Sequence, residues 1–517
     1  MAENGREDEN LSEDTLLIKE NLKQEKKVTK YSHRLIIYTI IFVLILFITS
    51  FILTISGGVL WFVTYKDIHT QVTHEMSLQN GTLIYEQWIA PDARIYKDFY
   101  IFNWTNPSDL ALGIAPKLIE VGPYRYREYR NKTVTAVSEN GCHVIYTQHK
   151  LFVFDRGATS VDLSEDDVIQ TLNLPLAGAV HIAKKSIFLT AALNSIILET
   201  NSSLYKSLTV KQLIWGYEDD FIKELKKLYI FPKDKNFSIF INDNPQDQEP
   251  SIVNTGVCDS KALGEFIQWD GNRQMDIWGD QYANMINGTE GFFFRPFLNS
   301  NDRITFFVDD AMRSIELACK NSHTEHKGID TLRYGLPLYF LQNASCNPAN
   351  ARWYQFCPQG LFYIGNSSIM PDVPAYGSKP HFLDADPNLL SNVSGLFPDR
   401  EIHDLFVDIE PTTGVTIAVH NRVQINFKLE RTEIVYFNEI PSLLYLPILY
   451  SDESITLSKE LYTHISSKLN TIDLVFSISL VVVVAGLFCL LASTVSSCCL
   501  LTNIRSVLKK DSNPSSD

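Results

Sequence analysis

Two long apolar runs lie near the two ends of the chain. The segment from Leu35 to Tyr65 contains no charged residue, and neither does the segment from Leu474 to Ile504. Each run exceeds the roughly 20 residues that a helix needs to cross a bilayer. A cleaved signal peptide does not fit the first run, because the run is too long and a charged segment of 34 residues precedes it. The pattern predicts two membrane helices, at residues 35–65 and 474–501.

A third apolar stretch, from Val168 to Leu198, is predicted to stay out of the membrane. A spanning helix here would place Lys184 and Lys185 near the bilayer centre, at a cost of about 2.5 to 3.5 kcal/mol each. Pro175 would also interrupt it. We expect a pair of mostly buried helices in a water-soluble head, with both lysines reaching solvent.

The segment from Val415 to Glu430 alternates with a period of two. Its odd positions are apolar except at Asn421, and its even positions from His420 onward are polar. This pattern predicts a long two-faced strand, which suits a large antiparallel sheet or barrel around a core or a cavity. Because we find no internal repeat and no long low-complexity linker, one mixed domain over residues 66–473 is favoured. The expected fold class is an α+β membrane protein.

Basic residues are distributed unevenly around the two apolar runs. Lys66 alone follows the first run closely, and the other flanking basic residues are Lys19, Lys23, Lys26, Lys27, Lys30 and Arg34 before the first run, and Arg505, Lys509 and Lys510 after the second. By the positive-inside rule both termini, residues 1–34 and 502–517, should be cytosolic, with residues 66–473 outside the cell or in a lumen. The formal net charge of -15 argues against nucleic-acid binding, which depends on lysine and arginine.

Nine N-x-[ST] triplets between the runs are candidate glycosylation sites. They begin at Asn80, Asn103, Asn131, Asn201, Asn236, Asn287, Asn343, Asn366 and Asn392. Five of the eight cysteines lie in the same region, where disulfides persist, and their odd number leaves at least one unpaired or paired with another chain. Cys498 and Cys499, at the cytosolic end of the second run, are candidates for palmitoylation.

Signals for catalysis or metal binding are weak. The chain has no G-x-S-x-G, H-E-x-x-H or Walker pattern. His323 and His326 could form half of a metal site, but no further ligands are evident, so a polar loop is the better interpretation. We therefore expect no enzyme activity, no metal and no cofactor.

Five stretches in order resemble one known family. The stretch "FYIFNWTNPSDLALGIAPKLIEVGPYRYRE", from Phe99 to Glu128, resembles the signature of the class B scavenger receptor family. Four further stretches agree with that family: Leu208–Phe221, Asn284–Gly291, Phe306–Ile315 and Val407–Phe427. The resemblance covers both membrane runs and the region between them. It implies a hairpin membrane topology and an antiparallel, barrel-like ectodomain topped by a helical bundle.

The resemblance also implies an apolar tunnel that carries lipid toward the membrane. A hydrophobic lipid in a preformed apolar conduit avoids water, and the alternating strand could supply the wall of that conduit. The residues expected to line it are Ile417, Val419, Val423, Ile425 and Phe427. A barrel with a filled core would show the same pattern.

One short segment resembles the apical helix that contacts ligands or partners in this family. It reads "AVHIAKKSIF", and its polar residues His181, Lys184 and Lys185 are the candidate binding residues. His181 could respond to endosomal pH, or it could be an ordinary hydrogen-bonded histidine.

The cysteines depart in part from those of the family. Met312 and Ala283 stand where relatives carry cysteine, so those disulfides cannot form here. Cys346 and Cys357 resemble the short-loop pair of the family, so a disulfide between them is expected. The cysteines without an assigned partner are Cys142, Cys258 and Cys319.

The expected function is that of a scavenger-receptor-like membrane protein. It should bind lipids (fatty acid, sterol or phospholipid) or lipoprotein-like particles, and transfer lipid toward the membrane. The alternatives are a lysosomal sorting receptor for a protein ligand at the apical helices, a two-helix ligand-gated channel and an ectoenzyme anchored at both ends. Glu13, Leu17 and Ile18 fit the acidic dileucine pattern of lysosomal sorting, so an endosome–lysosome membrane competes evenly with the plasma membrane.

Overall fold

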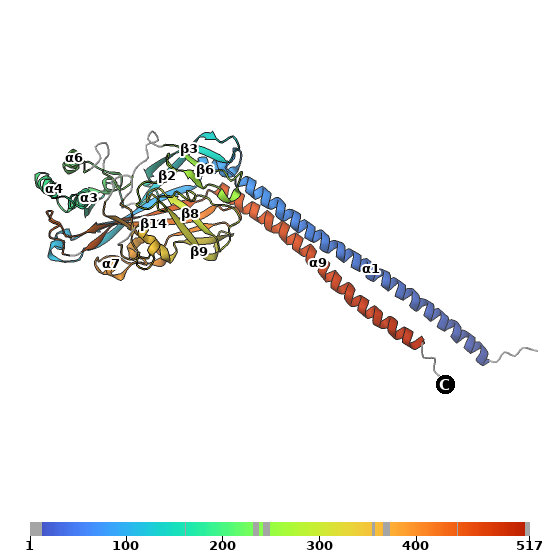
Figure 1. Cartoon of the computed structure of the whole chain (residues 1–517). Coiled ribbons are helices and arrows are strands. Elements are labelled where there is room, and N and C mark those ends of the chain that lie inside the picture. The colour runs from blue at the N-terminus through green and yellow to red at the C-terminus, as the bar shows by residue number, and fades with distance from the viewer. Residues whose placement is uncertain are drawn as a thin grey trace, which may run out of the picture. The chain divides into compact units, whose positions relative to one another are not determined.

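The computed structural model describes most of the chain (Figure 1). The described residues are 13–160, 162–230, 237–240, 249–353, 357–365, 373–441 and 443–511. The chain divides into two compact units, of which one comprises Met1–Thr70 with Ser467–Asp517 and the other comprises Gln71–Ser466. The second unit is called the ectodomain below.

The described residues of the first unit belong to two long helices. Helix α1 spans Glu13–Glu75, and helix α9 spans Lys459–Asp511. Both contain a segment that is long and apolar enough to cross a membrane, and these segments include the two runs predicted from the sequence. Large apolar side chains such as Phe42 and Phe488 are exposed, as expected of surfaces that lipid would cover.

The two long helices approach each other closely at glycines. A Cβ atom placed on Gly57 would lie 2.8 Å from Cγ2 of Val483, and one placed on Gly486 would lie 2.7 Å from the backbone nitrogen of Thr54. Small residues let helix backbones come this close within a bilayer, where van der Waals packing drives helix association. The two glycines therefore mark the point at which the helices cross.

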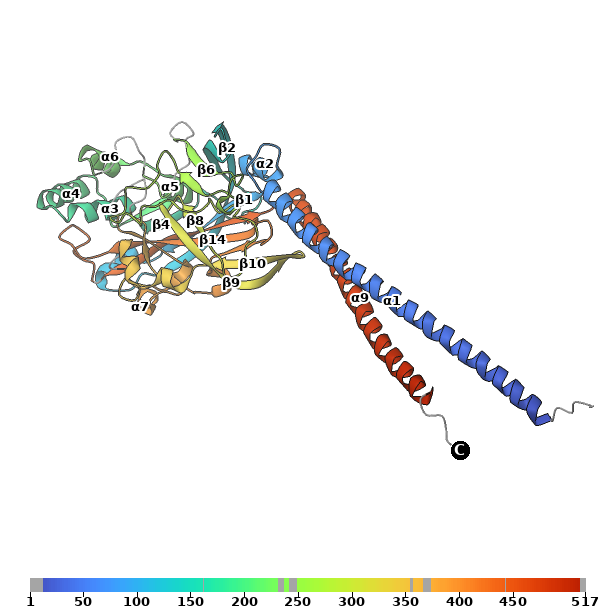
Figure 2. The same cartoon turned by 45° about the vertical axis from the view of Figure 1, so that its right-hand side comes forward.

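The ectodomain is built on one large antiparallel sheet (Figures 1 and 2). Its described residues contribute 13 strands. Its main path has the order β7-β6-β3-β2-β1-β15-β14-β13-β10-β9-β8, while β12 pairs with β14 and β11 pairs with β12. These strands are β1 Arg94–Trp104, β2 Leu118–Val137, β3 His143–Phe154, β6 Ser251–Asn254, β7 Phe266–Gln268, β8 Arg303–Val308, β9 Arg313–His326, β10 Ile329–Gly335, β11 Phe362–Tyr363, β12 Ala375–Ser378, β13 Phe406–Ile409, β14 Thr416–Leu429 and β15 Leu444–Thr456. The predicted alternating strand is therefore β14, at the centre of the sheet.

The strand register distinguishes the two faces of the sheet. Residues directly opposite each other in antiparallel strands point to the same side. Asn421 lies opposite Glu453, and Glu453 lies opposite Lys97. The ammonium group of Lys97 lies 2.8 Å from the carboxylate of Asp310, in the turn between β8 and β9 at the far end of the strand order. The sheet therefore curls so that distant strands meet across this side, which we call the inner face.

A short segment connects the two edges of the curled sheet. The amide of Phe266, in β7, donates to the carbonyl of Gly288 at 2.9 Å, while the amide of Thr289 donates to the carbonyl of Thr305, in β8, at 3.2 Å. Gly288 has a φ of 82°, and a Cβ atom there would lie 2.1 Å from the Thr305 carbonyl oxygen, so only glycine fits. Within the described residues β7 and β8 do not pair directly. A closed barrel therefore stays a prediction.

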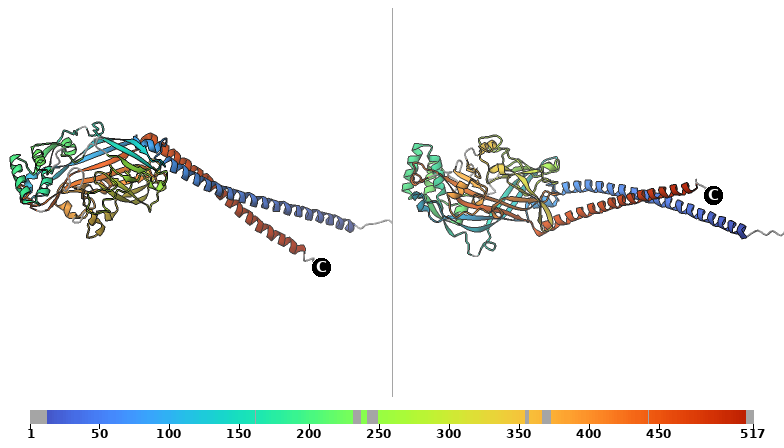
Figure 3. Two further views of the ribbon diagram at one scale, coloured as in Figure 1. Left: turned by 45° about the horizontal axis from the view of Figure 1, so that its top comes forward. Right: turned by 90° about the horizontal axis from the view of Figure 1, so that it is seen from below.

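Four of the described helices gather at one end of the ectodomain, which we call the apex (Figures 1, 2 and 3). They are α3 Leu174–Ala183, α4 Ile187–Glu199, α5 Val210–Trp215 and α6 Asp220–Lys227. Polar caps set where they begin: Thr209 and Gln212 form a capping box at α5, and the Asp219 carboxylate accepts from the amide of Ile222 at α6.

The apolar stretch 168–198 is divided between a strand and two helices. Its first residues, Val168–Leu172, form strand β4, which pairs with β5, Tyr205–Thr209, in a separate two-stranded sheet. Asn173 then caps α3, and Ser186 caps α4. The predicted helix pair is confirmed, but it begins later than the apolar pattern does. Only α3 is mostly buried, whereas α4 buries Leu193, Ile196 and Ile197 and leaves most of its other residues exposed or half-buried.

The middle of the polar face of β14 is covered by protein rather than by solvent. Gln424 and Asn426 are fully buried and hydrogen-bonded to each other at 2.7 Å. The amide group of Asn426 also donates to the carbonyl of Tyr376 at 3.1 Å and to the hydroxyl of Ser378 at 3.0 Å. The covering segment follows β12 and contains the short helices η5 Pro380–Phe382, α7 Pro387–Ser391 and α8 Arg400–His403.

The remaining short helices of the described residues lie in the connections between the larger elements. They are α2 Leu83–Ile89, η1 Pro107–Leu112, η2 Ser260–Ala262, η3 Leu338–Leu341 and η4 Pro348–Arg352. Helix η1 lies within the stretch from Phe99 to Glu128 and begins shortly after Trp104, where β1 ends. Its first residue is Pro107, whose fixed φ suits the first position of a helix.

Candidate functional site

The residues predicted to line a tunnel alternate on the inner face of β14. Ile417, Val419 and Phe427 are buried, whereas Val423 and Ile425 are only half-buried. Both half-buried side chains pack against the main hydrophobic core. The middle of the strand is thus more open than its two ends.

An aromatic group shares the inner face with Val423. Val423 lies opposite Ser451, and Ser451 lies opposite Phe99, so these three side chains occupy one rung of the sheet. The ring of Phe99 lies 5.6 Å from that of Tyr126 and 5.1 Å from that of Phe240, between ring centres. This rung and its neighbours form an apolar wall toward the apex.

The next rung carries charges instead of apolar side chains. Lys97 lies opposite Glu453, one rung closer to the end of β15 from which the chain continues into α9. Further charged residues from β2, β3 and the loops join them. We call this set the inner ionic cluster, and its members are Lys97, Glu128, Arg130, Lys132, Lys150, Glu290, Asp309, Asp310 and Glu453.

Ion pairs connect the members of the inner ionic cluster. The guanidinium of Arg130 lies 2.7 Å from the carboxylate of Glu128 and 3.5 Å from that of Glu453. The ammonium group of Lys132 lies 2.9 Å from the carboxylate of Glu290. Buried charges are tolerated only when they are paired in this way. The cluster is therefore a layer of paired charges on an otherwise apolar face.

Burial and neighbouring charges shift the pKa values within the inner ionic cluster. Burial lowers the pKa of Lys132 to about 8, although Glu290 opposes the shift. Burial and the nearby Glu128 raise the pKa of Glu453. Burial also works against the charge of Glu128, but Arg130 and Lys150 outweigh it and lower the pKa of that carboxyl. Glu453 therefore takes up a proton more readily than Glu128 does.

At the apex, the predicted binding residues lie where α3 turns into α4. His181 is half-buried, and Lys184 and Lys185 are exposed. Lys184 forms an ion pair with Glu430, just after β14. Partial burial raises the pKa of Glu430, but the hydrogen bonds from Lys184 and Lys428 outweigh it and lower the pKa to about 2. Lys184 is thus engaged within the protein.

The sequence interpretation missed two apolar residues at this turn. Ile187 and Phe188 are 81% and 84% exposed, the largest exposures among the apical apolar side chains. They occupy the first turn of α4, directly after its cap Ser186 and ahead of the buried residue Leu193. The cap position in the sequence could have shown that these two residues precede the buried face of the helix.

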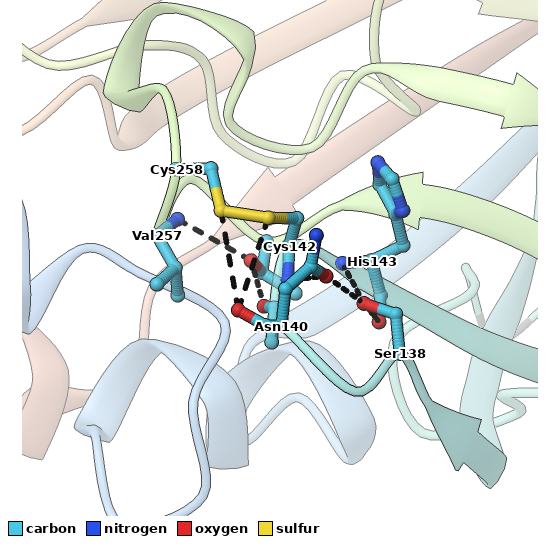
Figure 4. Close-up of a disulfide and its surroundings, with 8 residues drawn as sticks. Ser138, Asn140, Cys142, His143, Val257 and Cys258 are labelled. Carbon is cyan, nitrogen blue, oxygen red and sulfur yellow. Dashed lines mark hydrogen bonds between the residues drawn. A yellow bond between two sulfur atoms is a disulfide. The ribbon is translucent and has the colours of Figure 1, made fainter.

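The structure contains one disulfide, between Cys142 and Cys258, whose Cα atoms lie 5.3 Å apart (Figure 4). Cys142 stands before β3 and Cys258 follows β6. These strands pair, with His143 opposite Asn254. The amide of Thr255 also donates to the carbonyl of Cys142 at 2.9 Å. Strand pairing therefore brings the two cysteines together across 116 residues of sequence.

The predicted bridge between Cys346 and Cys357 is not present in the structure. Both residues are free thiols, as is Cys319. Cys346 is exposed in a turn, whereas Cys357 is buried in the main hydrophobic core. Burial raises the pKa of the Cys357 thiol to about 12, which makes it a poor nucleophile for disulfide exchange.

The sequons differ in accessibility. Asn103 and Asn343 are half-buried, and the side-chain carbonyl of Asn103 accepts a hydrogen bond from the amide of Gln170 at 2.8 Å. Asn236 and Asn366 lie outside the described residues. The exposed acceptors are Asn80, Asn131, Asn201, Asn287 and Asn392.

The remaining predicted sites lie in or beside the long helices, or on β9. Cys498 and Cys499 are exposed on α9. Glu13, Leu17 and Ile18 fall in the first turns of α1, and their side chains lie outside the described part. His323 is exposed, and His326 contacts Asp408 at 2.6 Å. Among the described residues no group of three His, Cys, Asp or Glu side chains could hold a metal ion.

Comparison with known proteins identifies close sequence relatives. The sequence model of the CD36 family matches residues 48–497. Lysosome membrane protein 2 of Rattus norvegicus is 32% identical over 453 residues, covering 86% of this chain and 91% of that protein. The human protein of the same name is 30% identical over 463 residues, covering 88% and 93%. Scavenger receptor class B member 1 of Cricetulus griseus is 30% identical over 411 residues, covering 79% of each chain.

Proposed function

Because the chain belongs to the CD36 family, we propose that it is a class B scavenger receptor that binds lipids or lipoprotein-like particles at the apex. In this proposal the lipid then passes along the inner face of the sheet toward the membrane. The relatives' names place one of them in the lysosome membrane and call another a scavenger receptor. The proposal assigns no catalytic residue and no cofactor.

The partial exposure of Val423 and Ile425 carries this proposal. Both side chains lie at mid-strand on the inner face, and Ile425 lies opposite Leu449, which is fully buried. A filled core would bury all of these side chains alike, because protein interiors are close-packed. Partial exposure at this place supports open space beside β14, where an acyl chain or a sterol could lie out of water.

The inner ionic cluster limits where the lipid can pass. Lipid in contact with the buried ion pairs would separate charges from their partners, which costs several kcal/mol. Most members of the cluster stand on β2, β3 and the loops, whereas Val423 and Ile425 stand on β14. The proposed route therefore follows β14, and the lipid does not contact the ion pairs on β2 and β3.

The exposed pair Ile187 and Phe188 is the proposed contact at the apex. Large apolar side chains that stand free of the surface are typical of sites that bind a partner or a lipid surface. Lys184 and Lys185 lie beside them, and their positive charges would favour an anionic surface. Ile187 and Phe188 could equally contact a protein, which is the basis of the second candidate function, recognition of a protein ligand for sorting to the lysosome.

Substituting Val423 by tryptophan tests the lipid route. If open space lies beside β14, the larger ring should fill it and lower lipid transfer from particles to the membrane by about tenfold, while the melting temperature stays unchanged. In a filled core the same ring would overpack its neighbours and cost about 1 to 3 kcal/mol of stability. Transfer per folded molecule and thermal unfolding should be measured on the same preparation.

A matched control variant is available on the outer surface. Val153 is an exposed valine of β3, so Val153→Trp makes the same substitution away from the inner face. This control should transfer lipid as the natural protein does. Lost stability with normal transfer per folded Val423→Trp molecule would show that no lipid passes this strand.

We also propose that both termini are cytosolic and that the ectodomain is glycosylated. Removing N-linked glycans enzymatically should lower the mass of the protein by several glycans, all mapping between residues 66 and 473. Peptide mapping before and after digestion measures this directly, and Asn131 and Asn287 should be among the occupied sites because both are exposed. A glycan on Asn10, in the N-terminal tail, would contradict the topology.

A further inference from the structure

Two buried histidines of the segment that covers β14 face each other. His381 lies in η5, and His403 is the last residue of α8; they are 3% and 5% exposed. Their rings are stacked, with centres 4.3 Å apart and planes inclined by 25°. The ring of Tyr450 lies 5.7 Å from His381 and 6.0 Å from His403, and Phe102 lies 5.4 Å from His381. We call His381 and His403 the histidine pair.

Both members of the histidine pair hold the same short loop by its backbone. Nδ1 of His381 accepts a hydrogen bond from the amide of Phe397 at 3.0 Å. Nδ1 of His403 accepts one from the amide of Asp399 at 2.9 Å. An imidazole nitrogen that accepts a hydrogen bond carries no proton, so each ring is neutral in this arrangement. Nε2 of His381 lies 2.6 Å from the carboxylate of Glu120 and therefore carries the proton of that ring.

Charged and titratable groups reach the pair from several elements. Glu120, at 2.6 Å from His381, comes from β2, and Tyr450 comes from β15. Asp399 lies in the loop itself, and Arg422 faces the pair from β14 while its guanidinium is bound to Asp452 at 2.9 Å. Burial lowers the pKa of His403 to about 4, and a proton on the neighbouring His381 adds to that shift, as does Arg422, while Glu120 and Asp399 oppose it.

The backbone around His381 is held in a conformation that side chains seldom adopt. His381, Phe382 and Asp384 have φ values of 53°, 58° and 62°. Such left-handed conformations persist in bulky residues only where the surroundings enforce them. Here the amide of His381 donates to the side-chain carbonyl of Gln424 at 2.7 Å, and the Asp384 carboxylate accepts from Lys379 at 2.8 Å. Loss of the loop contacts would remove part of what enforces the strained backbone.

We propose that the histidine pair is an acid-sensitive latch, which holds the loop Phe397–Asp399 against the sheet at neutral pH and releases it in an acidic compartment. A proton on Nδ1 removes the acceptor of the loop amide, and the other ring lies too close to tolerate a second charge. The released loop carries Phe397, which is 76% exposed, and leads into α8. The latch would give the protein two different surfaces in neutral and acidic surroundings.

The direction of the pH effect follows from the lowered pKa of His403. When the latch is open, this imidazole is solvated and takes up a proton near its ordinary pKa of about 6.5. When the latch is closed, protonation begins only near pH 4. The closed form therefore has its full stability above about pH 6.5 and loses it as the pH falls toward about 4. This window contains the pH of endosomes and lysosomes.

Amide hydrogen exchange on the full chain in detergent tests the latch. Peptides that cover residues 393–405 should be compared at about pH 7 and about pH 5, after correction for intrinsic exchange rates. Protection of the Phe397 and Asp399 amides should fall by about tenfold or more at the lower pH. Equal protection at both pH values would overturn the proposal.

Two asparagine variants distinguish protonation of His403 from an overall loss of stability at low pH. In His403→Asn the side-chain carbonyl can replace Nδ1 as acceptor for the Asp399 amide but takes up no proton, so protection of the Asp399 amide should no longer depend on pH. His323→Asn changes an exposed histidine of β9 and should keep the pH response of the natural protein. Loss of protection at low pH in His403→Asn, as large as in the natural protein, would contradict the latch. If His403→Asn does not fold, the comparison of the natural protein at the two pH values decides.

Discussion

Substituting Glu128 by leucine is expected to destabilise the ectodomain by about 3 to 5 kcal/mol. The carboxylate of Glu128 lies 2.7 Å from the guanidinium of Arg130, and both side chains are almost fully buried. Leucine would leave Arg130 without its nearest partner, with Glu453 at 3.5 Å as the carboxylate that remains. An uncompensated buried charge costs far more than the lost ion pair itself, because the charge cannot return to water.

Thermal or denaturant unfolding of the purified protein measures this effect. Lys227→Met is the matched control, because it breaks the ion pair of Lys227 with Glu224 on the exposed surface of α6. Exposed pairs of this kind contribute between zero and about 1 kcal/mol, so the control should unfold nearly as the natural protein does. A loss below about 1 kcal/mol in Glu128→Leu would show that water reaches the inner ionic cluster and screens it.

Local pattern was sufficient to predict the two candidate membrane helices and the strand β14. The runs at 35–65 and 474–501 fall within α1 and α9, because the length of an uncharged segment is a property of the sequence alone. The alternation over Val415–Glu430 likewise predicted a strand whose apolar positions share one face. What the pattern could not show is that Gln424 and Asn426 are buried, because the segment that covers them is remote in sequence.

The inner ionic cluster could not be recognised from the sequence. In β2, the charged residues Glu128, Arg130 and Lys132 alternate with Tyr129 and Asn131. The ordinary interpretation places the charges outside, but the structure places them inside and leaves Tyr129 and Asn131 exposed. Only the register of β2 with β1 reveals this orientation. The charges are stable there because partners from distant segments, among them Glu290 and Asp309, meet them.

At the apex, too, the sequence did not predict contacts between residues that are distant in the chain. The sequence predicted two helices between residues 168 and 198 and located Lys184 and Lys185 in solvent, as the structure confirms. It did not predict that Lys184 would pair with Glu430, since 246 residues separate the two. The same holds for the histidine pair, whose two rings come from different parts of the covering segment.

Removing the disulfide between Cys142 and Cys258 should destabilise the ectodomain by about 4 to 5 kcal/mol, because the bridge closes a loop of more than 100 residues in the unfolded chain. The double variant Cys142→Ala with Cys258→Ala should therefore unfold at a clearly lower temperature. Cys346→Ser, which changes an exposed free thiol, should change the free energy of unfolding by less than about 0.5 kcal/mol.

Non-reducing peptide mapping of the natural protein identifies the bonded cysteines independently of stability. Peptides that contain Cys142 and Cys258 should be recovered linked to each other, and those that contain Cys346 and Cys357 should be recovered separately with free thiols. A linked peptide of Cys346 and Cys357 would contradict the structure at this point. Because β3 and β6 already pair beside the bridge, the double variant should still refold to the same structure on cooling. Its loss of stability then measures how much the bridge lowers the conformational entropy of the unfolded chain.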